Sequence, residues 1–437
     1  MTPNRPRRVA LALATTALVA TLAAACASPE GATGPTAAAS AAPTITTTEP
    51  TTTPPPTPTA PAPREPQAQA DLDQRLRDAA WANDVSAARD LIARGADVNA
   101  KDDTQQSAYL VTTSEGYLDL LNLTLAHGGD VASKDSFNGT GLIRAGERGH
   151  TGVVGRLIQA GVEVNHVNWL GWTALHEAII LGKGTATYDD TVRVLVAGGA
   201  DVRLPSRRDG VAPLDHSRSK GYANQVATLD KALRQDGAGP VDKVEANRRL
   251  LDAATSGDAD GAALALRAGA DLETTGERRR TPLLLAATND RTDVARVLVA
   301  LGANPNALDE QHDTPWLVTG VTGSVPMLEA LLPAHPDLGI RNRFGGLSVI
   351  PASERGHVDY VRRVVRTGID VDHVNDLGWT AMLEAVILGD GGPRHQEIVR
   401  ILLAAGANRS IADKDGVTPL RHAQRRGYRE LAAILSA

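Results

Sequence analysis

The chain has 437 residues, of which 42% are apolar and 22% are charged, enough for two or three ordinary domains or for one long array of repeats. Aromatic residues make up 3% and the formal net charge is −6, a balance that disfavours nucleic-acid backbones and anionic lipid headgroups as partners. The single cysteine excludes an intrachain disulfide, a thiolate zinc site and an iron–sulfur cluster.

Residues 1–26 have the pattern of an export signal. A basic start, residues 5–8, precedes a 17-residue apolar run that ends at Cys26. The small residues before Cys26 resemble the lipobox at which bacterial lipoprotein signal peptides are cleaved, with the usual leucine one position early. We interpret residues 1–26 as such a signal and expect a lipid on Cys26 to hold the protein on the outer face of the bacterial cytoplasmic membrane. An ordinary secretory cleavage and an uncleaved anchor are the alternatives.

Residues 27–70 are rich in proline, threonine and alanine. This composition cannot bury a core, and proline favours the extended polyproline II conformation. At about 3.1 Å per residue the segment could span on the order of 100 Å. We predict a disordered stalk that holds the folded part away from the membrane.

The rest of the chain repeats with a period of 33 residues, which is clearest in the units that start at Thr281, Thr314, Leu347 and Thr380. In the first of these, Thr281 is suited to the N-cap of a helix and Pro282 to its first position. Gly302 is suited to the left-handed end of a second helix. Each unit is therefore predicted to be a helix, a tight turn, a second helix and a long loop.

These units resemble the ankyrin repeat. A Gly-Ala-Asp or Gly-Ala-Asn phrase ends the second helix at Gly95, Gly199, Gly269, Gly302 and Gly406. The resemblance covers about residues 72–437, with two degenerate units and with Pro333 interrupting one second helix. It implies an all-α solenoid of stacked helix pairs. It also implies that the long loops between units, called fingers here, project from the stack and line one side of a concave groove.

A longer repeat lies over the 33-residue period. Residues 164–182 align without gaps on residues 371–389, with 14 of 19 positions identical at an offset of 207. Five units precede and six follow a break in the helical pattern. We predict a first array over residues 71–236, a linker over residues 237–247 and a second array over residues 248–437, with a hinge or an imperfect junction between them.

The resemblance places candidate partner contacts beside the turn glycines of two equivalent fingers, at Trp169, Leu170, Trp172, Asp376, Leu377 and Trp379. An exposed tryptophan in a concave surface is a typical interface anchor. Trp172 and Trp379 could instead pack on neighbouring fingers. Trp169 is the better contact candidate because its counterpart is Asp376. In the same fingers, His166 and His373 are predicted to stabilise turns by hydrogen bonding.

The two duplicated units also carry extra residues between their helices, in segments 183–190 and 390–397. Insertions in a solenoid usually form surface loops and can bind partners, although they can also be inert. We therefore name a second set of candidates in predicted loops: Tyr188, Asp189, Asp190, Arg394 and His395.

The sequence contains none of the common catalytic or phosphate-binding motifs. We expect no catalytic residue, no metal site and no cofactor. By analogy with the fold, we predict a non-catalytic scaffold that binds an unidentified protein through its fingers and concave helix surface. Its contact with the membrane would be through the lipid alone. The alternatives are a receptor with a small-molecule or glycan site near residues 235–247, and a mechanical spacer.

Overall fold

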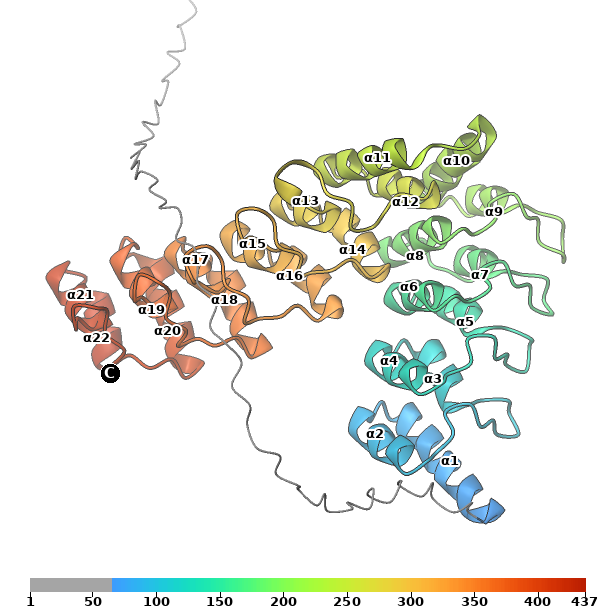
Figure 1. The fold of residues 1–437 in the computed structure, drawn as a ribbon, viewed down its shortest axis with the longest axis horizontal. Coiled ribbons are helices and arrows are strands. Elements are labelled where there is room, and N and C mark those ends of the chain that lie inside the picture. The colour runs from blue at the N-terminus through green and yellow to red at the C-terminus, as the bar shows by residue number, and fades with distance from the viewer. Residues whose placement is uncertain (1–64) are drawn as a thin grey trace, which may run out of the picture. The chain divides into compact units, whose positions relative to one another are not determined.

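The computed structural model describes residues 65–437, so the predicted signal peptide, Cys26 and all but the end of the predicted stalk lie outside the described residues. The described part is all-helical, with twenty-two α-helices and three short 3-10 helices (Figure 1). Consecutive α-helices form eleven antiparallel pairs, five in a first array and six in a second.

Array 1 consists of α1 (Pro66–Trp81), α2 (Val85–Ala93), α3 (Ala108–Glu115), α4 (Leu118–Ala126), α5 (Gly141–Arg148), α6 (Thr151–Gln159), α7 (Ala174–Ile180), α8 (Ala186–Ala197), α9 (Pro213–Ser219) and α10 (Ala223–Ala238). Array 2 consists of α11 (Lys243–Ser256), α12 (Ala259–Arg267), η1 (Glu277–Arg279), α13 (Pro282–Thr288), α14 (Thr292–Ala300), α15 (Pro315–Thr322), α16 (Val325–Leu331), η2 (Leu332–Ala334), α17 (Val349–Glu354), α18 (Val358–Val364), η3 (Val365–Thr367), α19 (Ala381–Ile387), α20 (Pro393–Ala404), α21 (Pro419–Arg425) and α22 (Arg429–Ser436).

Local sequence signals set the helix ends. The Thr281 hydroxyl accepts a hydrogen bond from the Leu284 amide at 3.2 Å, the N-cap contact predicted for it. Gly302 follows α14 with φ +93°, the left-handed conformation predicted there. α16 ends at Leu331 and gives way to a 3-10 turn that contains Pro333. The predicted roles of Thr281 and Gly302 at helix ends are therefore confirmed, and Pro333 lies just after the end of α16.

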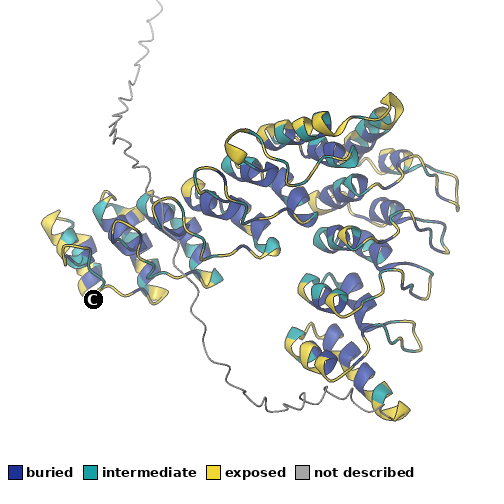
Figure 2. Ribbon diagram, in the orientation of Figure 1, coloured by how far each residue is buried: buried dark blue, intermediate teal, exposed yellow. Residues whose placement is uncertain are grey.

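Within each array, first helices stack on first helices and second helices on second helices. The contact surfaces bury leucine, valine and alanine side chains (Figure 2). Because each pair of helices buries its apolar face against its neighbours, the core runs along the stack and has no single centre.

Two predicted boundaries differ from the structure. α1 begins at Pro66, so residues 66–70 are helical and do not continue the extended stalk. α10 runs to Ala238 and α11 begins at Lys243, so the non-helical junction is residues 239–242, shorter than the predicted linker 237–247. α1 and α11 thus begin earlier than the repeat pattern indicates, and α10 ends later, through Asp236 and Gly237, which have low helix propensity.

Array 2 does not continue the stack of array 1 in line. α12 packs against α8, and α14 packs against both α6 and α8 (Figure 1). Leu264, Val297 and Ala300 of array 2 belong to the same buried cluster as Leu157 and Val194 of array 1. The second helices of the two arrays therefore share an apolar interface.

Buried polar contacts accompany this inter-array interface. Asp260 of α12 accepts hydrogen bonds from Arg193 Nε at 2.8 Å, from Thr228 Oγ1 at 2.7 Å and from Lys231 Nζ at 3.0 Å. Burial raises the pKa of Asp260, but the three donors outweigh it and the net pKa is lowered. The ion pair thus stays charged within the interface.

None of the helices in residues 65–437 combines the length and the hydropathy needed to span a bilayer.

Candidate functional site

Main-chain hydrogen bonds join neighbouring fingers. The Trp169 amide donates to the Phe137 carbonyl at 3.0 Å, and the Arg207 amide donates to the Gly171 carbonyl at 2.9 Å. In array 2, the Asp376 amide donates to the Phe344 carbonyl at 3.0 Å, which is the same contact shifted by 207 residues. The finger tips are therefore fixed relative to one another before any partner binds.

The finger tips expose apolar side chains on these fixed turns. Trp169 is 75% exposed and Phe137 is 49% exposed, while Leu170, next to Trp169 in the same turn, is half-buried. We call Phe137, Trp169 and Leu170 the finger ridge of array 1. A large apolar surface held in water by a rigid turn is a feature of protein-binding sites.

The equivalent fingers of array 2 differ from this ridge at one position. Phe344 and Leu377 are 53% and 51% exposed, but Asp376, which is also exposed, stands where array 1 has Trp169. The aromatic surface is therefore larger in array 1.

Trp172 and Trp379 are half-buried and belong to the support of the fingers. The side-chain oxygen of Asn168 accepts from the Trp172 amide at 3.0 Å, and that of Asn375 accepts from the Trp379 amide at 2.9 Å. The Arg208 guanidinium lies 5.7 Å from the centre of the Trp172 ring. The contact of the Trp172 ring with Arg208 favours the packing alternative for Trp172.

A buried carboxyl group completes each support. Asn168 donates to Glu177 at 2.7 Å, and Asn375 donates to Glu384 at 2.8 Å. Burial, with a nearby acidic residue in each case, raises the pKa of both glutamates to about 7. The two sites are equivalent under the 207-residue offset, so the same contact supports the finger in both arrays.

The two histidines predicted to stabilise turns do so. His166 Nε2 lies 2.7 Å from the Asn138 carbonyl oxygen, and His373 Nε2 lies 2.6 Å from the Gly345 carbonyl oxygen. Each imidazole ties one finger to the preceding one.

The prediction that the inserted residues form loops is wrong. Tyr188, Asp189 and Asp190 lie in α8, and Arg394 and His395 lie in α20. The insertions lengthen these helices to 12 residues and also widen the preceding turns to residues 181–185 and 388–392, so only the first part of each inserted segment is a loop. Arg394 is exposed, whereas the other four side chains are buried.

These buried side chains have structural partners. The Tyr188 hydroxyl donates to the Glu147 carbonyl at 2.9 Å, and His395 Nε2 lies 3.0 Å from the Glu354 carbonyl oxygen at the equivalent place in array 2. Asp189 accepts from the Asn224 side chain at 2.8 Å. The inserted residues therefore connect adjacent units.

The junction near residues 235–247 contains a cavity of about 540 Å³. An acidic side chain in its wall, Asp236 of α10, is already paired with Arg267 of α12 at 2.8 Å. This ion pair joins array 1 to array 2. In the described chain, no group of three or more histidine, cysteine or acidic residues is arranged to hold a metal ion.

Sequence reasoning missed Phe137 and Phe344, the exposed aromatic residues beside the predicted contacts. The signal was present, because the two residues are separated by 207 positions and each stands in a turn next to asparagine or glycine. A phenylalanine in a polar turn is not expected to reach the hydrophobic core. Its presence at the same place in both duplicated blocks indicates an exposed aromatic side chain.

Comparisons with known proteins agree with this architecture. A family model described as ankyrin repeats in three copies matches residues 108–206, 316–408 and 349–437, and a single ankyrin repeat model matches residues 278–310. Together the matches cover more than half of the chain. The putative ankyrin repeat protein YahD of Escherichia coli K12 is 38% identical over 188 residues, which are 43% of this chain and 94% of YahD.

Two solved structures are also similar. An ankyrin repeat domain from Acinetobacter baumannii AYE is 43% identical, with 43% of this chain and 95% of that chain covered and a TM-score of 0.42. EF0377, an ankyrin repeat protein, is 36% identical, with 44% of this chain and 97% of that chain covered and a TM-score of 0.42. With the family models matching most of its repeats, this chain belongs to the ankyrin repeat family.

Proposed function

We propose that this protein is a non-catalytic scaffold that binds another protein through the fingers and concave helix surface of array 1. The observation that carries the proposal is the finger ridge: Trp169, at 75% exposure, stands beside Phe137 on turns joined by main-chain hydrogen bonds. Fixing the turns in advance lowers the entropy lost on binding, and an aromatic anchor then supplies most of the affinity. A purely mechanical spacer would not require exposed aromatic side chains on its fingers.

We further propose that the scaffold acts outside the cytoplasm, attached by a lipid on Cys26. The support is the sequence of residues 1–26, with a basic start and an apolar run that ends at small residues before the cysteine. Labelling of cells with a palmitate analogue tests it directly. Label on the wild-type chain that disappears in Cys26→Ser supports the lipid anchor, and equal label in both contradicts it.

The binding proposal is tested by capture of partners from the native envelope with the full chain as bait. We compare the wild type with a Phe137→Ala, Trp169→Ala double variant. The matched control is Trp81→Ala, which removes a tryptophan that is 48% exposed at the end of α1, away from the fingers. Mass spectrometry identifies the retained proteins.

We expect a protein that the wild type and the Trp81→Ala control retain and that the double variant loses, with unchanged circular dichroism in all three. Retention by the double variant at the wild-type level would show that the ridge is not the binding surface. Since both ridge side chains project into water, their removal leaves the helix packing intact.

A further inference from the structure

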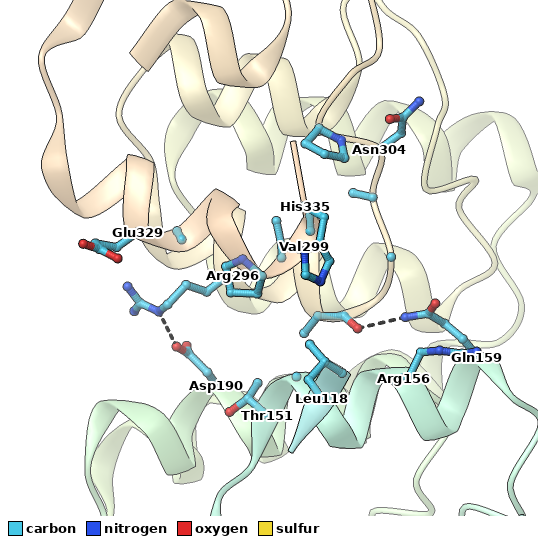
Figure 3. A pocket seen from close by; sticks show the side chains of 18 of the residues that line it. Leu118, Thr151, Arg156, Gln159, Asp190, Arg296, Val299, Asn304, Glu329 and His335 are labelled. Carbon is cyan, nitrogen blue, oxygen red and sulfur yellow. Dashed lines mark hydrogen bonds and ion pairs between the residues drawn. The ribbon is translucent and has the colours of Figure 1, made fainter. Parts of the chain in front are cut away.

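The interface between the arrays leaves a cavity beside it. α14 touches α6 and α8, whereas α16 and η2 of array 2 stand away from α4 of array 1. The space between them has a volume of about 730 Å³ (Figure 3). At its rim, His335 Nε2 lies 3.0 Å from the Asp119 carboxylate, so that a polar contact links the arrays there. Its volume is typical of a small-molecule site, and such sites often form where two units meet.

Apolar groups form much of the cavity wall. Leu118 comes from array 1, and Val299, Pro305 and Pro333 come from array 2. These are aliphatic or proline side chains, and no phenylalanine, tyrosine or tryptophan lines the cavity within the described residues. This part of the wall is therefore suited to an aliphatic chain.

Most of the charged side chains in the wall are neutralised. Arg296 donates to Asp190 at 2.6 Å at one end of the cavity (Figure 3), and Glu329 is paired with Arg363. These acidic groups are therefore unavailable to a cationic ligand.

Arg156 is the exception among the charged residues that line the cavity in the described chain. Its Nε donates to the Asn122 side chain at 2.7 Å, which orients the guanidinium, but its two terminal nitrogens have no protein acceptor within residues 65–437. Gln159 stands beside it at the opposite end of the cavity from Asp190 (Figure 3). An oriented guanidinium with two unpaired terminal nitrogens can donate to both oxygens of a carboxylate.

We propose that this inter-array cavity binds a small aliphatic carboxylate, with the carboxylate on Arg156 and the aliphatic body against Leu118, Val299 and Pro305. The site is separate from the finger ridge, and it exists because array 2 packs on the second helices of array 1. Binding would therefore stabilise the contact between the arrays.

The test is isothermal titration calorimetry of the full chain with decanoate, and with 1-decanol as the uncharged probe of the same length. We expect one saturable decanoate site on the wild type. Arg156→Gln should weaken it roughly tenfold to a hundredfold, since it removes a charge-assisted contact, and Arg156→Lys should weaken it less. Ala186→Trp, which fills the cavity from the exposed start of α8, should abolish it.

The matched control is Arg429→Gln, the same change of charge on an exposed residue of α22, which should leave decanoate binding unchanged. Binding of 1-decanol should be weak and equal in the wild type and in Arg156→Gln. Absence of a saturable decanoate site on the wild type would overturn the proposal, as would wild-type affinity in Ala186→Trp. Circular dichroism checks the fold of each variant, and Ala186→Trp decides the outcome if Arg156→Gln fails to fold.

Discussion

Gly155 is the position at which a single methyl group should separate the two arrays. A β-carbon added there would lie 1.9 Å from the carbonyl oxygen of Ala300 in α14 and 2.5 Å from its carbonyl carbon. Both are backbone atoms and cannot rotate away. α6 and α14 would have to move apart by roughly 1 Å or more to restore ordinary van der Waals contact.

The expected cost of Gly155→Ala follows from two opposing effects. Overpacking a close-packed contact costs about 1–3 kcal/mol, and replacing glycine by alanine within a helix returns roughly 0.5–1 kcal/mol. These ranges give a net loss in the free energy of unfolding between about 0 and about 2.5 kcal/mol, and we expect about 2 kcal/mol because the clashing atoms belong to the backbone. Gly152→Ala is the matched control on the same helix, because its nearest neighbour, Leu118 Cδ2, would be at 3.5 Å, an ordinary contact. That variant should be as stable as the wild type or slightly more stable.

Urea unfolding measures the stability of both variants, and hydrogen exchange locates the change. Because units of a repeat array can unfold separately, the exchange data are needed beside the overall transition. We expect faster exchange in α6, α12 and α14 of Gly155→Ala than in the control. Equal stability and equal protection in the two variants would refute the reasoning that the arrays meet at Gly155.

Two further predictions concern buried charges. The pKa of Glu177 is about 7 in the folded chain against an ordinary 4.5, so the folded state holds the proton more tightly and the free energy of unfolding falls as the pH rises from 4.5 through about 7. Glu177→Gln should be more stable than the wild type above pH 7, by up to about 3 kcal/mol, and should match it near pH 4.5, as measured by urea unfolding across pH. Asp260→Ala should cost about 3 kcal/mol in the same assay, because it leaves Arg193 buried with Asp190 as its one remaining carboxylate.

Each of these variants has a matched partner in the chain. Glu384→Gln should reproduce the pH dependence of Glu177→Gln, since its carboxyl group has the same asparagine contact and a pKa of about 7. A pH-independent difference from the wild type would contradict the assignment. Asp215→Ala breaks an exposed pair with Arg218 and should cost less than about 1 kcal/mol. A loss as large as that of Asp260→Ala would show that burial of the pair is not what matters.

The architecture of each unit was predictable because its causes are local. Thr281 caps a helix through the amide three residues on, and Gly302 adopts a backbone conformation that other residues avoid. The hydrogen-bonding role of His166 was predictable for a similar reason, since its partner lies in the adjacent finger at a repeating distance.

The fate of the inserted segments was not predictable from the insertion itself. Extra residues between two helices can enlarge the turn or lengthen either helix, and the choice depends on what the new residues can contact. Here Tyr188 reaches the Glu147 carbonyl and His395 reaches the Glu354 carbonyl, so lengthening the second helix satisfies buried groups of the preceding unit. Those contacts join different repeat units, so the inserted sequence alone does not reveal them.

By itself, the sequence determined the repeat, the helix ends and the fingers, because these depend on residues within one unit or its neighbour. The packing of array 2 on array 1 was decided by tertiary structure. Val194 and Val196 of α8 are fully buried by it, whereas their counterparts Ile401 and Leu403 in α20 are equally apolar but only half-buried. The difference lies in a residue on the neighbouring helix: array 1 has Gly155 where array 2 has Arg362. The backbone of another helix can approach the glycine closely but cannot approach the arginine in this way. The interface and the cavity beside it therefore depend on shape complementarity between helices that are distant in the sequence. Such complementarity produces no periodic pattern in the sequence.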